Sequence, residues 1–404
     1  MRSIKQSWGT VAVLVGMFVL AWFAWRLPFY EFSEEYSAEQ VGSFLSLAYL
    51  NNLLPLGLIL LLSTLGIILC IQVRKQILRK DPAFGRFFET RTGSASKTVR
   101  GQRKIGFMTV RWAAMLAAAF LMIFGGTVLG LRFSQVSLPI FSCPVNTEQM
   151  TESSCYYLSH LNDLFELPLR DILLFFGTTV GFALLLGRAI CGFLCPMGLV
   201  QDVTHAIRQR AKVEGISMTD RMYAALTPVK WMMVFLMLGL CFLGGNFCNF
   251  CPVISVSPIL AGIQTSLYFS GFFMVFALIG SFFKRRFFCL ICPLGVLLGL
   301  LHKITPFRIK KDCTACTECG ACYEACPMGI KQIYTEREKA DVTDMNCILC
   351  GECVKKCPED NALAMTFAGK RIYTASRKQV MSGYQREGRK LDRKLDREEK
   401  GDRL

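Results

Sequence analysis

Two short segments near the carboxyl end of the chain carry cysteines at a spacing suited to inorganic chemistry. They read CTECGACYEACP, from Cys316 to Pro327, and CILCGECVKKCP, from Cys347 to Pro358. Each follows the pattern C-x2-C-x2-C-x3-C-P. In this pattern three thiolates on one tight loop bind one four-iron cluster, and the fourth cysteine reaches the other cluster. The sequence therefore predicts two 4Fe–4S clusters. The ligands of the first are Cys316, Cys319, Cys322 and Cys357, and those of the second are Cys347, Cys350, Cys353 and Cys326.

Two other kinds of site use clustered cysteines. A disulfide framework is disfavoured in a cytoplasmic segment, and zinc sites do not use a duplicated four-cysteine run that ends in proline. Gly320 and Gly351 are expected to let the backbone turn close to the inorganic core. Cys313 is surplus to the pattern, so we predict a spare thiol there.

A second kind of motif occurs twice, each time after a long apolar segment. ICGFLCPMGLVQDVTH, residues 190–205, is echoed by FCLICPLGVLLGLLH, residues 288–302. The first copy carries the pair Cys191 and Cys195, and the second carries Cys289 and Cys292. Spacings of four and three residues predict that each pair shares one helix face. The proline that follows should then reorient the chain.

The apolar runs and the charge pattern described below predict that these four thiols lie on the cytoplasmic side of a membrane. Four further thiols are predicted on the opposite, outer side, namely Cys143, Cys155, Cys248 and Cys251. Because four thiolates complete a four-iron site, our hypothesis is one more cluster for each group of four. For the inner group, Cys191, Cys195, Cys289 and Cys292, the alternative is packing, since free cysteine behaves as a small hydrophobe. For the outer group, a Cys143–Cys155 disulfide is the rival. Cys70 and Cys241 are predicted to be packing residues.

The composition indicates a membrane protein, since the 404 residues are 52% hydrophobic and yet carry a net charge of +16. Several apolar runs approach the roughly 20 residues that cross a bilayer. They are Trp8–Trp25, Phe44–Val73, Met108–Leu131, Leu169–Leu186, Trp231–Gly245 and Ser266–Phe283. We therefore predict an all-α polytopic membrane bundle of about six transmembrane helices, followed by a small α+β two-cluster ferredoxin-like domain.

The distribution of charge predicts the orientation. Arg74–Lys104 carries ten Lys or Arg against two acids, whereas Pro28–Ser43 carries four acids and no base. Lys and Arg accumulate on the cytoplasmic side of membrane proteins. We therefore predict a protein of the bacterial inner membrane whose two termini and ferredoxin-like domain lie in the cytoplasm. The basic residues lie between apolar spans, so lipid contact explains them better than nucleic-acid binding does.

These patterns divide the chain into three parts. Residues 1–303 form the predicted transmembrane domain with its paired-cysteine motifs, and 304–368 form the predicted bacterial-type two-cluster ferredoxin domain. Residues 369–404 form a charged cytoplasmic tail. Lys310, Lys311, Lys355 and Lys356 could dock an acidic partner, and a solvated surface is the plainer interpretation of the same lysines.

With these motifs, residues 108–366 resemble the NapH/NosR-type membrane polyferredoxins, and the smaller NapH-like group more closely. The second repeat departs from that family's C-x3-C-P pattern, because Phe288 stands where a strict repeat would have cysteine. The large extracytoplasmic flavin domain of the NosR type has no counterpart in the sequence. The resemblance implies an electron-transfer subunit of an oxidoreductase complex, working between the quinone pool and a periplasmic reductase system with redox partner subunits.

Other cofactors and functions are less well supported by the sequence. The sequence contains no C-x-x-C-H motif, so c-type haem is not predicted. It also contains no nucleotide-binding glycine motif, so neither NAD nor flavin is indicated. His205 and His302 occupy equivalent repeat positions, where haem ligation, quinone contact and helix-end packing are the alternatives; His160 is isolated. Two other functions would use similar motifs: a metal-reducing assembly protein for a terminal oxidase, and a redox-sensing membrane regulator.

Overall fold

The computed structural model describes residues 47–80, 106–129, 133–138, 151–153, 168–216, 220–242, 251–252 and 269–376. Several predictions lie outside these residues. They are the predicted span Trp8–Trp25, the thiols of Cys143, Cys155 and Cys248, His160, and the tail beyond residue 376.

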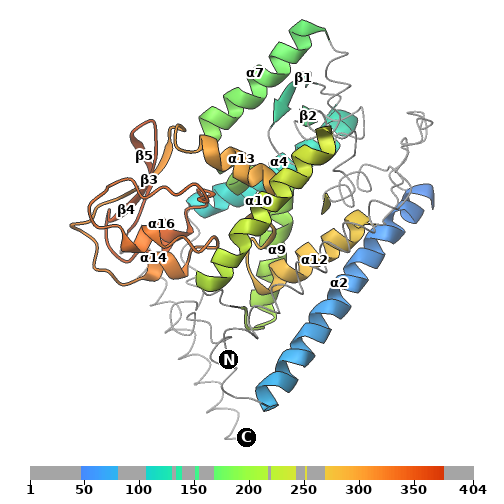
Figure 1. Ribbon diagram of the computed structural model, residues 1–404, viewed down its shortest axis with the longest axis horizontal. Coiled ribbons are helices and arrows are strands. Elements are labelled where there is room, and N and C mark those ends of the chain that lie inside the picture. The colour runs from blue at the N-terminus through green and yellow to red at the C-terminus, as the bar shows by residue number, and fades with distance from the viewer. Residues whose placement is uncertain are drawn as a thin grey trace, which may run out of the picture.

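Long apolar helices form the amino-terminal part of the described structure (Figure 1). They are α2 (Leu47–Lys80), α4 (Phe107–Leu129), α7 (Leu169–Leu186), α10 (Asp220–Phe242) and α12 (Phe269–Phe283). Two of them contain stretches long and apolar enough to cross a membrane, at Leu56–Ile77 and Met222–Gly239. Shorter apolar stretches occur at Phe107–Met122, Ile172–Leu186 and Ser270–Phe283. The helical class is confirmed, whereas the six crossings stay a prediction.

Short helices connect and close the bundle. They are α8 (Ala189–Phe193), α9 (Pro196–Arg210), the 3-10 helix η6 (Phe288–Leu290) and α13 (Pro293–Leu301). Helix α12 packs against both α2 and α9, α4 packs against α8 and α9, and α10 packs against α13. The core between them includes Met197, Met233, Met237 and Met274, whose unbranched side chains fill irregular gaps between helices.

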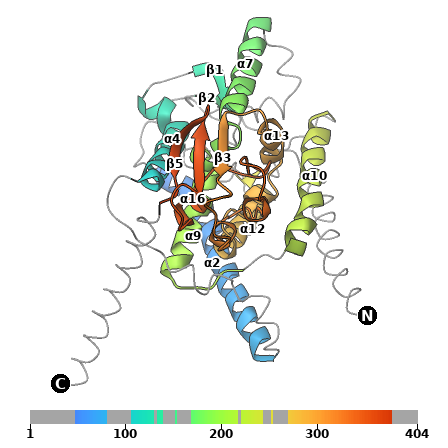
Figure 2. The same ribbon diagram turned by 90° about the vertical axis from the view of Figure 1, so that its left-hand side faces the viewer.

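The carboxyl-terminal part is a small α+β unit. Strands β3 (Phe307–Lys311), β4 (Leu363–Phe367) and β5 (Lys370–Thr374) form an antiparallel sheet in that order. The strands lie side by side in Figure 2. Helices α14 (Ala321–Glu324), α15 (Gln332–Thr335) and α16 (Glu352–Lys356) complete it. Strand β5 follows residue 368, so the sheet includes residues assigned from the sequence to the tail. A separate short parallel pair joins β1 (Phe133–Leu138) to β2 (Thr151–Ser153).

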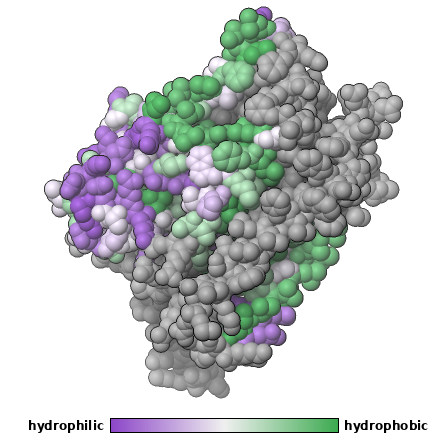
Figure 3. Space-filling model, viewed as in Figure 1, coloured by the Kyte–Doolittle hydropathy of each residue, from purple (hydrophilic) through white to green (hydrophobic). Residues whose placement is uncertain are grey.

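The helical part and the α+β unit differ in the polarity of their exposed residues. In the view of Figure 3, hydrophilic residues gather over the α+β unit and apolar residues cover the described helices beside it. On α2 alone, Leu60, Leu61, Leu65 and Leu69 are each more than half exposed. An exposed apolar surface of this kind is unusual for a soluble monomer and suits contact with lipid.

Candidate iron–sulfur centres

The first ferredoxin loop brings together the thiols predicted for one cluster. Gly320 begins α14 with a left-handed backbone (φ 75°), which reverses the chain between Cys319 and Cys322 as expected for glycine. A pocket is lined by the predicted set of Cys316, Cys319, Cys322 and Cys357. Burial, together with the neighbouring thiols Cys357 and Cys319, raises the pKa of Cys322 to about 11. Grouped thiols of this kind suit a bound cation, because coordination to iron stabilises the thiolate form.

The second loop repeats the arrangement in a more buried position. Gly351 begins α16 with φ 73°, and the predicted ligands Cys347, Cys350 and Cys353 are all buried. Cys326 comes from the first loop. Its thiol interacts electrostatically with those of Cys347, Cys350 and Cys353. Burial raises the pKa of Cys326 to about 11, and the charge of Cys350 adds to the effect. These interactions are in keeping with the predicted exchange of the fourth cysteine between loops, which stays a prediction.

No group of three or more His, Cys, Asp or Glu side chains in the described part of the chain is arranged to hold a single metal ion. A four-iron cluster holds its thiolates around a cage and not around one ion. The donor set therefore fits that cluster through its number and softness, and cluster binding by each named cysteine stays a prediction.

The repeated thiol pairs flank a break in the helix. Cys191 lies in α8, and Cys195 is the N-cap of α9 with φ −66° and ψ 119°. In the second copy Cys289 lies in η6, and Cys292 is the N-cap of α13 with φ −65° and ψ 121°. The expectation of a shared helix face was wrong, because the following proline occupies the first turn of a new helix. The near-identical cap angles support the internal repeat.

These four thiols come from separate segments and converge. The thiol of Cys292 interacts electrostatically with those of Cys191, Cys289 and Cys195. Burial, followed by the charges of Cys191 and Cys289, raises the pKa of Cys195 to about 12. At each cap a backbone N–H points back to the thiol, from Gly198 to Cys195 and from Gly295 to Cys292. N–H groups at a helix start favour an anion, so both caps suit thiolates.

The α+β unit lies directly against this inner group. A Cβ atom added to Gly192, between Cys191 and Cys195, would stand 2.3 Å from the carbonyl oxygen of Ile348. Ile348 lies between Cys347 and Cys350 on the second ferredoxin loop. The backbone of that loop therefore approaches α8 as closely as glycine allows.

Hydrogen bonds hold the same loop in place. Arg188 donates from Nη1 to the carbonyl oxygen of Met345 at 3.0 Å, and Lys230 Nζ donates to Asn346 Oδ1 at 2.8 Å. Phe107 of α4 stacks on Tyr373 of β5, with ring centroids 4.5 Å apart. The orientation of the α+β unit on the bundle is thus fixed by contacts with α4, α8 and α10.

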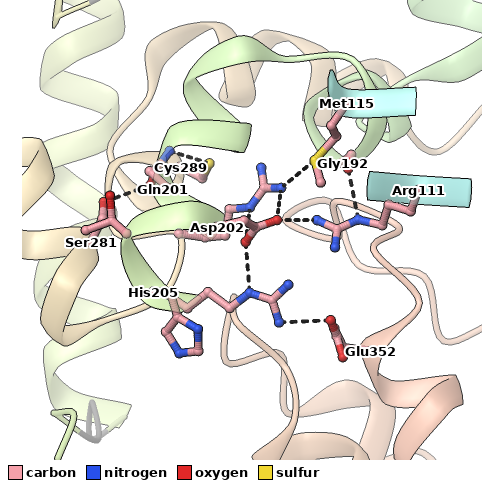
Figure 4. A network of polar contacts seen from close by, with 12 residues as sticks. Arg111, Met115, Gly192, Gln201, Asp202, His205, Ser281, Cys289 and Glu352 are labelled. Atoms are coloured by element: carbon pink, nitrogen blue, oxygen red, sulfur yellow. Dashed lines mark hydrogen bonds and ion pairs between the residues drawn. The ribbon is translucent and has the colours of Figure 1, made fainter. Parts of the chain in front are cut away.

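A buried ion network lies beside the inner thiols, with Asp202 of α9 at its centre (Figure 4). Its carboxylate accepts from Arg111 at 2.6 Å, from Arg285 at 2.9 Å and from Arg286 at 2.6 Å. The side chains of Asp202, Arg111 and Arg286 are fully buried. Burial alone would raise the pKa of Asp202, but Arg286 and then Arg285 bring that pKa well below its usual range. The carboxylate is therefore ionised at neutral pH and acts as the counter-ion of the three guanidinium groups.

The network extends into the α+β unit. Arg285 also donates to Glu352 of α16 at 3.0 Å. Burial by itself would raise the pKa of Glu352, but Arg285 and then Lys355 lower it to about 2. Glu352 therefore links the second ferredoxin loop to the helical bundle through an ion pair.

Replacing Glu352 by glutamine should weaken this attachment in a pH-dependent way. Since folding lowers the pKa of Glu352 from 4.5, its stabilising contribution is complete above about pH 4.5 and is lost as the pH falls toward 2. The thermal unfolding midpoint of E352Q should lie below that of the unsubstituted protein from pH 7 to 5, and the gap should shrink below that range. E318Q, at an exposed pair with Arg337, is the control. An equal deficit in E318Q would contradict the assignment.

The sequence reasoning missed this network entirely. Arg111, Gln201, Asp202 and Arg286 carry no metal-ligand spacing. The available signal was the presence of charged residues, Arg111 above all, inside or next to apolar runs, where such residues are rare and functional.

Other predicted residues have different surroundings. Lys311 is buried, and its ammonium donates to the carbonyl oxygens of Tyr334 and Glu336. For this lysine both the docking role and the solvated surface position were wrong. His205 Nε2 accepts a hydrogen bond from Arg208 Nη2 at 2.9 Å. His302 is 1% exposed and contacts the Thr305 hydroxyl at 3.2 Å. Both contacts suit helix-end packing. Cys251 is buried in the apolar core that also contacts the inner thiols.

Two family models match the chain. A 4Fe–4S binding domain matches residues 171–213 and 266–312, which contain the two repeated thiol pairs. A 4Fe–4S dicluster domain matches residues 315–363, which contain both ferredoxin loops. No solved structure matches the chain.

Curated relatives include one uncharacterized protein and two proteins with ferredoxin-type names. The uncharacterized protein MJ0750 of Methanocaldococcus jannaschii is 32% identical over 200 residues, which cover 48% of this chain and 77% of that protein. The ferredoxin-type protein NapH of Haemophilus influenzae is 26% identical over 246 residues, covering 58% and 80%. The methylamine utilization ferredoxin-type protein MauN of Paracoccus denitrificans is 29% identical over 143 residues, covering 35% and 48%. Paired thiols at helix starts, a docked dicluster unit and these relatives agree, and the chain belongs to the NapH/NosR-type family of ferredoxin-type membrane polyferredoxins.

Proposed function

We propose that this protein passes electrons between the quinone pool or a cytoplasmic donor and a partner reductase, for which the periplasm is the expected side. The observation that carries the proposal is the contact between Gly192 and the Ile348 carbonyl. It brings the second ferredoxin loop against the segment that carries the first inner thiol pair, so the second ferredoxin group and the inner group are neighbours in the fold. Electron transfer requires such closely spaced redox centres.

Each group of thiols would hold one 4Fe–4S cluster, which accepts and releases a single electron. The chain supplies the ligands, buries them and fixes their spacing. Cys353 connects the first two groups, since its thiol interacts with Cys322 of the first group as well as with Cys326 of its own group. The inner group is Cys191, Cys195, Cys289 and Cys292.

We expect electrons to enter or leave at the first group, on the cytoplasmic side, and the exposure of Cys319 supports this expectation. It is exposed, whereas all four thiols predicted for the second group are half-buried or buried. A soluble donor could therefore approach the first group more closely than the second group or the inner group.

The proposed location is a multi-pass inner-membrane protein with cytoplasmic termini. The apolar stretches of α2 and α10 and the exposed leucines of α2 support insertion in lipid. The proposed domains are residues 1–303 in the membrane and 304–368, extended by β5, as the ferredoxin unit. Helix α10 begins beside that unit, where Tyr223 meets Gly329, and Cys251 follows its far end. An outer cluster on Cys143, Cys155, Cys248 and Cys251, or a Cys143–Cys155 disulfide, belongs to the same proposal.

Iron content tests the number of centres. Anaerobically purified protein is expected to contain about 12 irons per chain when three groups are loaded, and about 16 when the outer group is loaded as well. C292S should lose about four of them and one EPR signal of the reduced protein, while the two ferredoxin signals remain.

C313S is the matched control, because Cys313 stands outside every predicted set, and it should keep the full iron content. About eight irons in both the unsubstituted protein and C292S would overturn the membrane clusters. Reduction of the remaining signals by a quinol would test the proposed donor.

A further inference from the structure

The buried ion network carries more positive than negative charge. Three guanidinium groups, of Arg111, Arg285 and Arg286, face two carboxylates, of Asp202 and Glu352. The sum of these charges is +1. A net charge inside a protein is unfavourable unless an opposite charge lies nearby.

Thiols of the predicted cluster sites provide the neighbouring negative charge. Arg286 interacts electrostatically with the thiol of Cys289, and with those of Cys191 and Cys195. Arg111 and Arg285 reach the thiol of Cys350 on the second ferredoxin loop in the same way. The network therefore lies between the inner group and the second ferredoxin group, within reach of both.

One guanidinium nitrogen of this network, Nη1 of Arg111, lacks a hydrogen-bond acceptor among the described residues. Arg111 Nε donates to the carbonyl oxygen of Gly192 at 3.0 Å, and Nη2 donates to Asp202. Nη1 is buried and has no hydrogen-bond acceptor among the described residues. Leaving a charged donor unpaired in the interior is costly, so its retention calls for an electrostatic explanation.

Gln201 adds a direct contact to a predicted ligand. Its Nε2 donates to Cys289 Sγ at 3.4 Å. Its Oε1 is held by the Phe288 backbone N–H at 3.0 Å and by the Ser281 hydroxyl at 3.2 Å. The amide orientation is thus fixed, with its donor side toward sulfur. Hydrogen bonds to cluster sulfur raise the reduction potential, because they stabilise the additional negative charge of the reduced state.

We propose that Arg111, Arg286 and Gln201 are positioning residues that raise the reduction potential of a cluster held by the inner thiols, so that it accepts electrons from the second ferredoxin group. This inference rests on the proposed function, since it concerns a cluster on Cys191, Cys195, Cys289 and Cys292. Burial of a four-thiolate site in a medium of low dielectric constant disfavours reduction. The net positive network and the contact from Gln201 Nε2 to Cys289 Sγ act against that effect.

A redox titration followed by EPR tests the inference in the full chain. The inner signal is identified as the one that C292S lacks. In R111M, that signal should titrate at a lower potential: at the midpoint of the unsubstituted protein, the ratio of reduced to oxidised centre should fall about tenfold, which is 59 mV for one electron. R111K keeps the charge and should restore most of the potential. Q201M should shift the inner signal in the same direction as R111M.

The control is R337M. Arg337 Nη1 lies 3.9 Å from Cys316 Sγ at the rim of the first group, so any shift should affect only the first ferredoxin signal. If R111M retains its iron and its inner signal titrates as in the unsubstituted protein, the inference is wrong while the proposed function stands. If R111M does not fold, Q201M decides by the same criterion. If the unsubstituted protein shows no signal that depends on Cys292, the proposed function fails and the inference fails with it.

Discussion

Replacing Asp202 by alanine should prevent the helical bundle from assembling around the inner thiols. The carboxylate is the shared counter-ion of Arg111, Arg285 and Arg286. Without it, three guanidiniums would remain in a buried region with one carboxylate, Glu352, at its edge. Removing one partner of a buried ion pair costs about 3–5 kcal/mol, and here one side chain serves three pairs. Since folded domains are stable by about 5–15 kcal/mol, D202A should remove most of the stability.

The measurement is the fraction of detergent-solubilised protein that is monodisperse and retains iron, together with its thermal unfolding midpoint. D202N keeps the shape and one acceptor oxygen, and should lie between D202A and the unsubstituted protein. E318A, at the exposed pair Glu318–Arg337, should cost less than about 1 kcal/mol. A D202A protein that is monodisperse and melts with the unsubstituted protein would contradict the central role of this carboxylate.

The ferredoxin part of the site could be described from spacing because three of the four predicted ligands in each group are local. Cys316, Cys319 and Cys322 lie on one short loop, and Gly320 within that loop has the left-handed backbone that its tight turn requires. Motif spacing of this kind determines which thiols can surround one cage. The assignment of Cys326 to the second group also follows from spacing, because the C-x3-C-P end carries the chain from one loop toward the other.

The inner group was predicted from its repeat, but its geometry was not. Periodicity alone placed Cys191 and Cys195 on one helix face, whereas the proline after Cys195 begins a new helix and makes that cysteine a cap. A rule about helix starts, applied to Pro196, would have predicted this. The convergence of the two pairs depends on the packing of α9 against α12, which no local pattern encodes.

The ion network is the part that sequence reasoning could not reach. Asp202 is separated from Arg111 by 91 residues and from Arg286 by 84. Pairing over such distances depends on the tertiary arrangement of α4, α9 and the end of α12. Charged residues near apolar segments were used only to predict orientation, and the buried position of Arg111 and Asp202 was not considered.

Replacing Gly192 by alanine should separate the second ferredoxin group from the inner group. The added Cβ would stand 2.3 Å from the Ile348 carbonyl oxygen, a distance that backbone atoms cannot tolerate, so α8 or the loop must move. Overpacking of this kind typically costs about 1–3 kcal/mol. Because no thiol is changed, G192A should keep its iron, while the inner signal becomes reduced more slowly once the ferredoxin signals are reduced. Freeze-quench EPR after mixing with a low-potential donor measures that delay.

Gly177 provides the matched control for this substitution. It lies in α7, and a Cβ added there meets no atom within 4 Å. G177A makes the same chemical change in a helix, and it should leave the reduction rate unchanged and stabilise α7 by up to about 1 kcal/mol. Equal reduction rates in G192A and G177A would mean that electrons do not pass across the Gly192–Ile348 contact. The second ferredoxin group and the inner group would then have to exchange electrons by another route or with separate partners.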